Sequence, residues 1–172
     1  MNLREEILKE HSKTHALKIA NYACQSKRNF KELMDCFLDD EYSLSQRAAW
    51  SVSWAARKKP GMLSPHIKDL VSVLHRQNIH DAVIRNSVRA LQEIDIPVKF
   101  HGKVMNACFQ FLETPATPVA IKVFSLTILY NLSKKYPEIK SELRLIIEER
   151  REHETAAFRS RAKKILPKLE KN

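Results

Sequence analysis

Hydrophobic residues recur three and four positions apart along most of the chain, with charged and polar residues between them. The segment from Phe30 to Leu38 shows this clearly, because its apolar residues share one side of a helix. No segment shows the alternating period of a half-buried β-strand. The pattern predicts an all-α fold, with helices over residues 2–11, 13–24, 30–40, 43–59, 63–74, 82–94, 98–112, 119–135, 137–150 and 156–169.

Several expected helix ends carry recognisable signals. Ser12 and Asn29 have side chains that commonly cap helix N-termini. Asp81 can cap the helix that follows it, or complement the positive end of that helix. The pair Pro60-Gly61 is a strong helix breaker. These signals divide the chain into short helices joined by tight turns.

A basic residue that opens an apolar run recurs at a nearly constant interval. It stands at Arg47, Arg85, Lys122 and Arg159, at steps of 38, 37 and 37 residues (85−47, 122−85 and 159−122). A period of this size is typical of stacked helical repeats. Each repeat would hold a first helix (A), a turn, and a second helix (B) that begins near the basic residue. We expect one domain over residues 1–172, built from five antiparallel pairs at residues 1–28, 29–60, 61–96, 97–136 and 137–172.

The residues at the starts of the B helices form a recognisable motif. The dipeptides are Gln46-Arg47, Ile84-Arg85, Ile121-Lys122 and Phe158-Arg159, and the candidate turn acids are Glu41, Asp81 and Glu154. With this motif the chain resembles the HEAT and armadillo class of α-solenoids. The resemblance implies a right-handed α-α superhelix of about five helix pairs, in which the B helices line a concave recognition surface. It implies little about the ligand.

The charge balance favours an acidic partner. The chain has 30 Lys and Arg against 20 Asp and Glu, for a formal net charge of +10. A lysine-rich surface that serves solubility would have the same composition. The three cysteines are far apart and lie among apolar neighbours, as free thiols do in a reducing compartment, so we expect a cytoplasmic protein. No apolar run approaches the ~18 residues of a membrane-spanning helix, and we expect no membrane partner.

If the repeats stack in register, the recurring cations form a row along the inner face, and Lys18 takes the corresponding place in the divergent first pair. The predicted basic surface comprises Arg47, Arg85, Arg89, Lys122, Arg159, Arg161 and Lys163. Evenly spaced cations can hold phosphates or an acidic peptide. In the other interpretation, each cation pairs with a turn acid and ties helix A to helix B. Lys122 has no acid nearby in the sequence, so this second interpretation is weakest there.

Two tryptophans and a basic segment have two interpretations each. Trp50 and Trp54 are four residues apart on one helix face, where they could stack nucleic-acid bases or pack in the core between repeats. The segment 157–172 holds six Lys or Arg against Glu170. Such a segment fits a contact surface, and it equally fits the polar cap that a terminal repeat needs.

No catalytic or metal-binding motif is recognisable. The chain has no Gly-rich phosphate loop, no nucleophile elbow and no zinc-deaminase motif. His11 and His15 have the spacing of a two-histidine metal site, but no third ligand or general base accompanies them. We therefore expect no catalytic residue, no cofactor and no metal.

Two functions remain open. The first is a non-enzymatic binding or scaffold module that recognises an acidic protein or peptide on the concave basic face. The second is a DNA- or RNA-binding protein related to the HEAT-like alkylpurine DNA glycosylases, whose class implies a basic groove with tryptophans and an essential aspartate. Asp81 and Asp95 are the aspartates near the expected groove, whereas the placement of both tryptophans on one helix departs from that class. The oligomeric state is left open.

Overall fold

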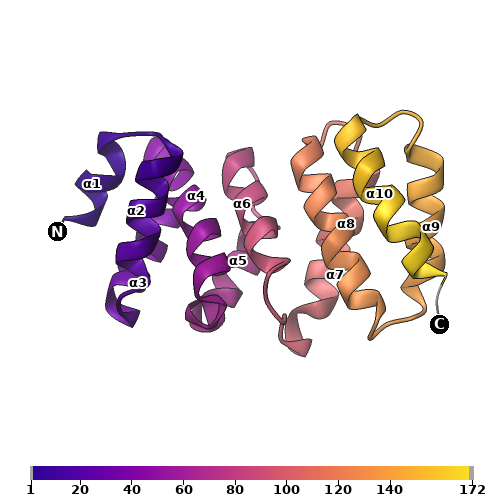
Figure 1. The fold of residues 1–172 in the computed structure, drawn as a ribbon, viewed down its shortest axis with the longest axis horizontal. Coiled ribbons are helices and arrows are strands. Elements are labelled where there is room, and N and C mark those ends of the chain that lie inside the picture. The colour runs from indigo at the N-terminus through magenta and orange to yellow at the C-terminus, as the bar shows by residue number, and fades with distance from the viewer. Residues whose placement is uncertain (1, 171–172) are drawn as a thin grey trace. The chain divides into compact units, whose positions relative to one another are not determined.

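The computed structural model describes residues 2–170, and every regular element among them is a helix (Figure 1). This confirms the expected all-α fold. The chain divides into two compact units, residues 1–96 and residues 97–172, hereafter unit 1 and unit 2. None of the described helices is both long and apolar enough to cross a membrane.

Unit 1 is built from six α-helices and one 3₁₀-helix. They are α1 (Leu3–Lys9), α2 (Lys13–Ala23), α3 (Lys27–Phe37), α4 (Tyr42–Lys58), η1 (Pro60–His66), α5 (Ile67–Val73) and α6 (Asp81–Leu91). Figure 1 shows α2, α4 and α6 side by side, and α4 contacts both of these neighbours. Helix α3 packs against α2 and α4, and α5 packs against α6. Each A helix thus covers one side of a layer of B helices, as expected for stacked hairpins.

Helix α4 is the centre of unit 1. It contacts α1, α2, α3, α6 and η1. Its buried surface is made largely of small side chains, because Ala48, Ala49, Ala55 and Ala56 are each fully buried. Alanine leaves room for neighbouring backbones to approach, so helices from both layers can pack closely around α4.

The caps of two helices differ from those expected. Helix α3 begins at Lys27, and its cap is Ser26, whose hydroxyl accepts a hydrogen bond from the backbone N–H of Asn29 at 3.1 Å. The expected cap, Asn29, lies inside the first turn. Helix α6 is capped by His80, whose Nδ1 accepts from the N–H of Ala82 at 3.0 Å. Asp81 stands in the first turn of α6, where its charge complements the helix end.

The segment after α4 also differs from the expected helix over residues 63–74. The breaker Pro60-Gly61 does end α4, but the chain then continues as η1 and becomes α-helical only at Ile67. Pro65 lies inside η1. Because proline lacks an N–H donor, a short 3₁₀ segment fits there better than the interior of an α-helix. The expected cap of α2 is confirmed, since the Ser12 hydroxyl accepts from the N–H of His15.

Unit 2 consists of two helical hairpins. They are α7 (Val98–Glu113) with α8 (Val119–Ser133), and α9 (Ile139–Arg150) with α10 (Ala156–Leu169). Helix α8 packs against α7, α9 and α10. Its side that packs against the other helices is buried at Ile121, Leu126, Ile128, Leu129 and Leu132, whereas Val123 and Phe124 are partly exposed. Phe158 of α10 is completely enclosed.

Candidate binding face on helices α2, α4 and α6

Two of the recurring cations in unit 1 are structural ties. The Arg47 Nη1 donates a hydrogen bond to the backbone carbonyl of Leu8 at 2.5 Å. This carbonyl belongs to the last turn of α1, where helix carbonyls lack intrahelical partners. Lys18 on α2 forms an ion pair with Glu6 of α1, at 2.7 Å between Nζ and Oε1. Both side chains therefore join a B helix to α1.

In unit 2, Lys122 is a buried tie. Only 3% of its side chain is exposed, and its Nζ lies 2.5 Å from Glu154 Oε1 and 3.3 Å from the carbonyl oxygen of Pro115. The expectation that Lys122 lacks an acidic partner is wrong, because the turn before α10 brings Glu154 to it. The Arg159 Nη1 donates to the backbone carbonyl of Glu154 at 2.7 Å. The same turn thus holds cations from both B helices of unit 2.

Arg85 differs from these four residues. It lies on the exposed side of α6 and forms no hydrogen bond or ion pair with any residue of the described part of the chain. Asp81, the candidate turn acid for this repeat, does not pair with it. The sequence motif therefore identifies the position of the cation correctly, but not whether its charge is satisfied within the fold.

Three cations surround Trp54, and we call Lys13, Trp54, Arg57 and Arg89 the Trp54 cluster. The Arg89 Cζ lies 5.0 Å from the centroid of the Trp54 ring, the Lys13 Nζ at 5.4 Å and the Arg57 Cζ at 5.5 Å. These cations come from α6, α2 and α4. The cluster therefore joins the three B helices of unit 1 at one point.

The Trp54 cluster is not fully satisfied within the protein. Trp54 Nε1 and Arg89 Nε are both buried, and neither has a hydrogen-bond partner among residues 2–170. Arg57 is paired, because its Nε lies 3.2 Å from Glu93 Oε1. Burial lowers the pKa of Arg89 below the ordinary value of an arginine, and the nearby Arg57 and Arg85 lower it further, whereas Glu93 opposes the shift. Positive charge is thus in excess at this point.

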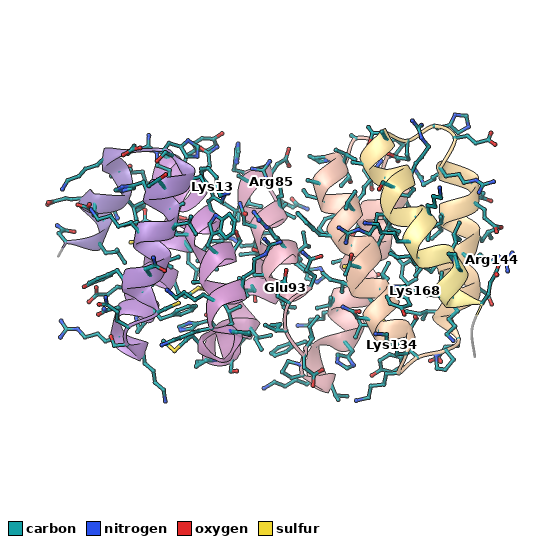
Figure 2. The ribbon with its side chains drawn as sticks, viewed as in Figure 1. Lys13, Arg85, Glu93, Lys134, Arg144 and Lys168 are labelled. Atoms are coloured by element: carbon teal, nitrogen blue, oxygen red, sulfur yellow. The ribbon has the colours of Figure 1, made fainter. Side chains whose placement is uncertain are left out.

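A cavity of about 340 Å³ lies beside this cluster, between α4 and α6, and we call it the α4–α6 cavity. It is lined by His11, Gln46, Trp50, Ala82, Arg85, Asn86 and Arg89. Trp50 meets the His11 ring edge-on, with centroids 5.5 Å apart. Both tryptophans are only half-buried, so the interpretation that places them in the core between repeats is correct only in part. Figure 2 labels Lys13 and Arg85 in the part of unit 1 that holds α2, α4 and α6.

The remaining predicted residues lie in unit 2. Arg161 donates from Nη1 to the Thr127 hydroxyl of α8. Lys163 is exposed and, with Arg159, is among the residues that line a cavity of about 530 Å³. Tyr130 lies between Lys134 and Lys168, whose Nζ atoms are 4.9 and 5.6 Å from its ring centroid. A row of cations that continues from α6 into α8 and α10 stays a prediction.

Some residues of the face were not predicted from the sequence. Lys13 and Gln46 have no local signal, because their position depends on how α2 and α6 pack against α4. Glu93 did have a sequence signal, since it follows Arg89 by four residues, although the structure places it in the turn just after the end of α6. His15 binds the carbonyl oxygen of Glu6 through Nε2. No group of three residues suited to a metal occurs in the part of the chain that the structure describes.

Comparison with known proteins identifies the family. The family model for a HEAT repeat domain matches residues 3–169, which is nearly the whole chain. No curated protein sequence matches the chain. The helical hairpins of both units and the recurring cation at the start of each B helix agree with this match. The chain therefore belongs to the HEAT repeat family.

Proposed function

We propose that this protein is a non-enzymatic binding module that recognises an acidic segment of a partner protein on the face formed by α2, α4 and α6. HEAT repeat domains generally mediate protein–protein interactions and are typically non-enzymatic. The family leaves open which surface binds and what it binds.

The observation that carries the proposal is the unpaired Arg85 beside the Trp54 cluster. Lys13, Arg57, Arg85 and Arg89 lie together on this face, and among residues 2–170 the one carboxylate paired with any of them is that of Glu93. Cations that a fold needs for itself are satisfied internally, as Lys122 and Arg47 are. Cations left over at one point of a surface attract an acidic partner and steer its approach.

Binding of an acidic peptide tests this proposal. A fluorescein-labelled peptide of alternating Glu and Gly should bind the full chain, with an affinity that falls as salt rises, because exposed charges are screened. The Arg85→Ala variant should lose about fivefold or more in affinity. Arg28→Ala is the control, because Arg28 is an exposed arginine of unit 1 that lies on the A helix α3, where it pairs with Glu32. Equal binding by both variants and the wild type would contradict the proposal.

Nucleic-acid binding is the alternative function. It requires cations that follow a phosphate backbone and aromatic rings open to bases. In unit 1, Lys18 and Arg47 are engaged with α1, and the ring of Trp54 is surrounded by three cations. These contacts favour the acidic protein segment. Labelled single-stranded and duplex DNA, and single-stranded RNA, should therefore bind more weakly than the acidic peptide at the same ionic strength.

A further inference from the structure

We propose that the α4–α6 cavity binds a single phosphorylated residue of the partner protein. This inference rests on the proposed function and narrows it, from an acidic segment to one phosphoryl group held by Arg85 and Arg89. Both arginines line the cavity, and they lie one helical turn apart on α6. Side chains with this spacing point to the same side of a helix.

The donors at this site match a phosphoryl group. Arg85 has its whole guanidinium available, since it has no hydrogen bond or ion pair within residues 2–170, and Arg89 has a buried Nε without a partner. A guanidinium presents its donors in a planar fork that fits phosphate oxygens two at a time. A phosphoryl group offers three strong acceptor oxygens, whereas a carboxylate offers two. Two arginines that converge on one cavity are therefore better satisfied by the phosphoryl group.

The positive charge at the site also favours a phosphoryl group. A phosphorylated side chain carries roughly −1.5 to −2 charges near neutral pH, and a carboxylate carries one. Glu93 is already paired with Arg57, so it does not neutralise Arg85. The pKa of Arg89 is lowered first by burial, next by repulsion from Arg57 and to a smaller extent by repulsion from Arg85, while Glu93 opposes the shift. A dianion in the cavity relieves this repulsion more completely than a single negative charge.

The site suits one group and not a chain of phosphates. Among the recurring cations of unit 1, Lys18 is paired with Glu6 and Arg47 is bound to the carbonyl of Leu8, which leaves Arg85 as the available one. A polyanion needs cations repeated along its length. A single available position beside a cavity is suited to point recognition of one modified side chain.

The shape of the cavity is compatible with this occupant. Its volume of about 340 Å³ lies at the lower end of ligand pockets in proteins. Gln46 and Asn86 add amide groups to its wall, and Trp50 adds an apolar surface. Asn86 is held in place, because its Nδ2 donates to the Ala82 carbonyl at 2.8 Å. The wall thus offers polar groups for the phosphoryl oxygens and an apolar surface for the carbon chain that bears them.

Three matched peptides test the inference on the full chain. They share one Gly-Ala sequence and carry phosphoserine, glutamate or serine at the central position, and their binding is followed by fluorescence anisotropy. The phosphoserine peptide should bind about tenfold more tightly than the glutamate peptide, and the serine peptide should bind least. Inorganic phosphate should displace the phosphoserine peptide better than chloride at equal ionic strength.

Variants assign this binding to the cavity. Arg85→Ala should lower the affinity for the phosphoserine peptide about tenfold or more. Arg85→Lys should recover only part of this loss, because lysine keeps the positive charge but not the planar, forked donors of the guanidinium. Arg28→Ala should leave the affinity for the phosphoserine peptide unchanged. Because Arg85 is exposed and without a partner in unit 1, its variants should keep the wild-type circular dichroism and melting temperature, which separates a loss of binding from a loss of fold.

The outcomes distinguish this inference from the proposed function. If the glutamate and phosphoserine peptides bind equally well and both depend on Arg85, the phosphoryl inference is overturned and the proposed function stands. If no peptide binds, both are overturned. If DNA or RNA binds more tightly than every peptide and depends on Arg85, both are replaced by the nucleic-acid alternative. If the phosphoserine peptide binds the Arg85 variants as tightly as it binds the wild type, the assignment of this binding to the α4–α6 cavity is overturned.

Discussion

Lys122 lies 2.5 Å from Glu154, and only 3% of its side chain and 12% of that of Glu154 are exposed. The two residues join the B helix of one hairpin to the turn of the next. A buried charge without its partner is strongly unfavourable, because the protein interior solvates it poorly. The pair is therefore a point at which a small change affects the packing of unit 2.

Lys122→Ala should destabilise the protein by about 3–5 kcal/mol, because it leaves Glu154 buried without its cation. Urea unfolding followed by circular dichroism measures this loss. Arg144→Ala is the control, since the Arg144–Glu148 pair is about half exposed, and its loss should stay below about 1 kcal/mol. The double variant Lys122→Met with Glu154→Leu should recover most of the stability. Equal small losses for both single variants would contradict a structural role of the buried pair.

Glu6 gives a second prediction, which concerns pH. It accepts hydrogen bonds from Lys18 and Lys9, and these two contacts lower its pKa from 4.5 to about 2. The folded state therefore holds this proton less tightly than the unfolded state, so stability rises with pH. The contribution of Glu6 should be complete above about pH 4.5 and should disappear as the pH falls towards 2.

Melting temperatures from pH 6 down to pH 2 test this behaviour. The wild type should be more stable than Glu6→Gln at the upper end of this range, and the difference should shrink as the solution becomes acidic. Glu5→Gln on the same helix is the control, because the Glu5 carboxylate is exposed and bonded only to the side chain of Asn2. A constant difference between wild type and Glu6→Gln at every pH would show that the pKa of Glu6 is not depressed by folding.

The sequence predicts where the recurring cations of the B helices lie, but it does not predict which residues they contact. The interval between Arg47, Arg85 and Lys122 follows from the repeat, so the residues could be selected without a structure. Glu154 lies 32 positions after Lys122, and it reaches Lys122 only because the hairpin between them folds back. The same limit applies to Lys13 and Trp54, whose contact depends on the rotation of α2 against α4.

At the level of the helices, the N-terminus of α6 is capped by His80, a residue type that is not among the common N-caps. His80 accepts from the N–H of Ala82 through Nδ1, so the neutral ring acts as an asparagine or serine would. The ring of Tyr42 packs against it edge-on, with centroids 4.4 Å apart. The cap therefore also connects α6 to the start of α4.

His80→Ala should cost about 1 kcal/mol of stability, because the N–H of Ala82 loses its acceptor. His80→Asn keeps an acceptor at the same position and should recover a large part of the loss. Urea unfolding at neutral pH measures both variants. The capping role would be contradicted if the asparagine variant were as unstable as the alanine variant.

Helix existence could be predicted from apolar periodicity, whereas helix ends depended on local contacts. Residues 98–112 and 119–135 were expected as helices, and α7 and α8 differ from these ranges by at most two residues at either end. The expected start of α3 after Asn29 is wrong, because the helix begins three residues earlier, at Lys27. In the structure Ser26 takes the cap, and the Asn29 amide donates to the carbonyl of Tyr22 instead.

At the level of the whole molecule, membership of the HEAT repeat family explains the helical hairpins, and differences between corresponding residues distinguish the proposed binding face from the rest of the array. The cation occurs at the start of the B helix in both units, but it is buried in α8 and exposed in α6. A repeated scaffold therefore carries a non-repeated site. The proposed binding of an acidic partner depends on the exposure of Arg85, and the motif that the repeats share does not predict this exposure.

The central position of α4 has a consequence for how the protein opens. This helix touches α1, α2, α3, α6 and η1, and its residues Ala48, Ala49, Ala55 and Ala56 are fully buried. Its backbone amides can therefore exchange with deuterium only when most of unit 1 has come apart. In a mass-spectrometric exchange experiment, peptides from residues 48–56 should take up label last within unit 1, and peptides from α1 and η1 should take it up early.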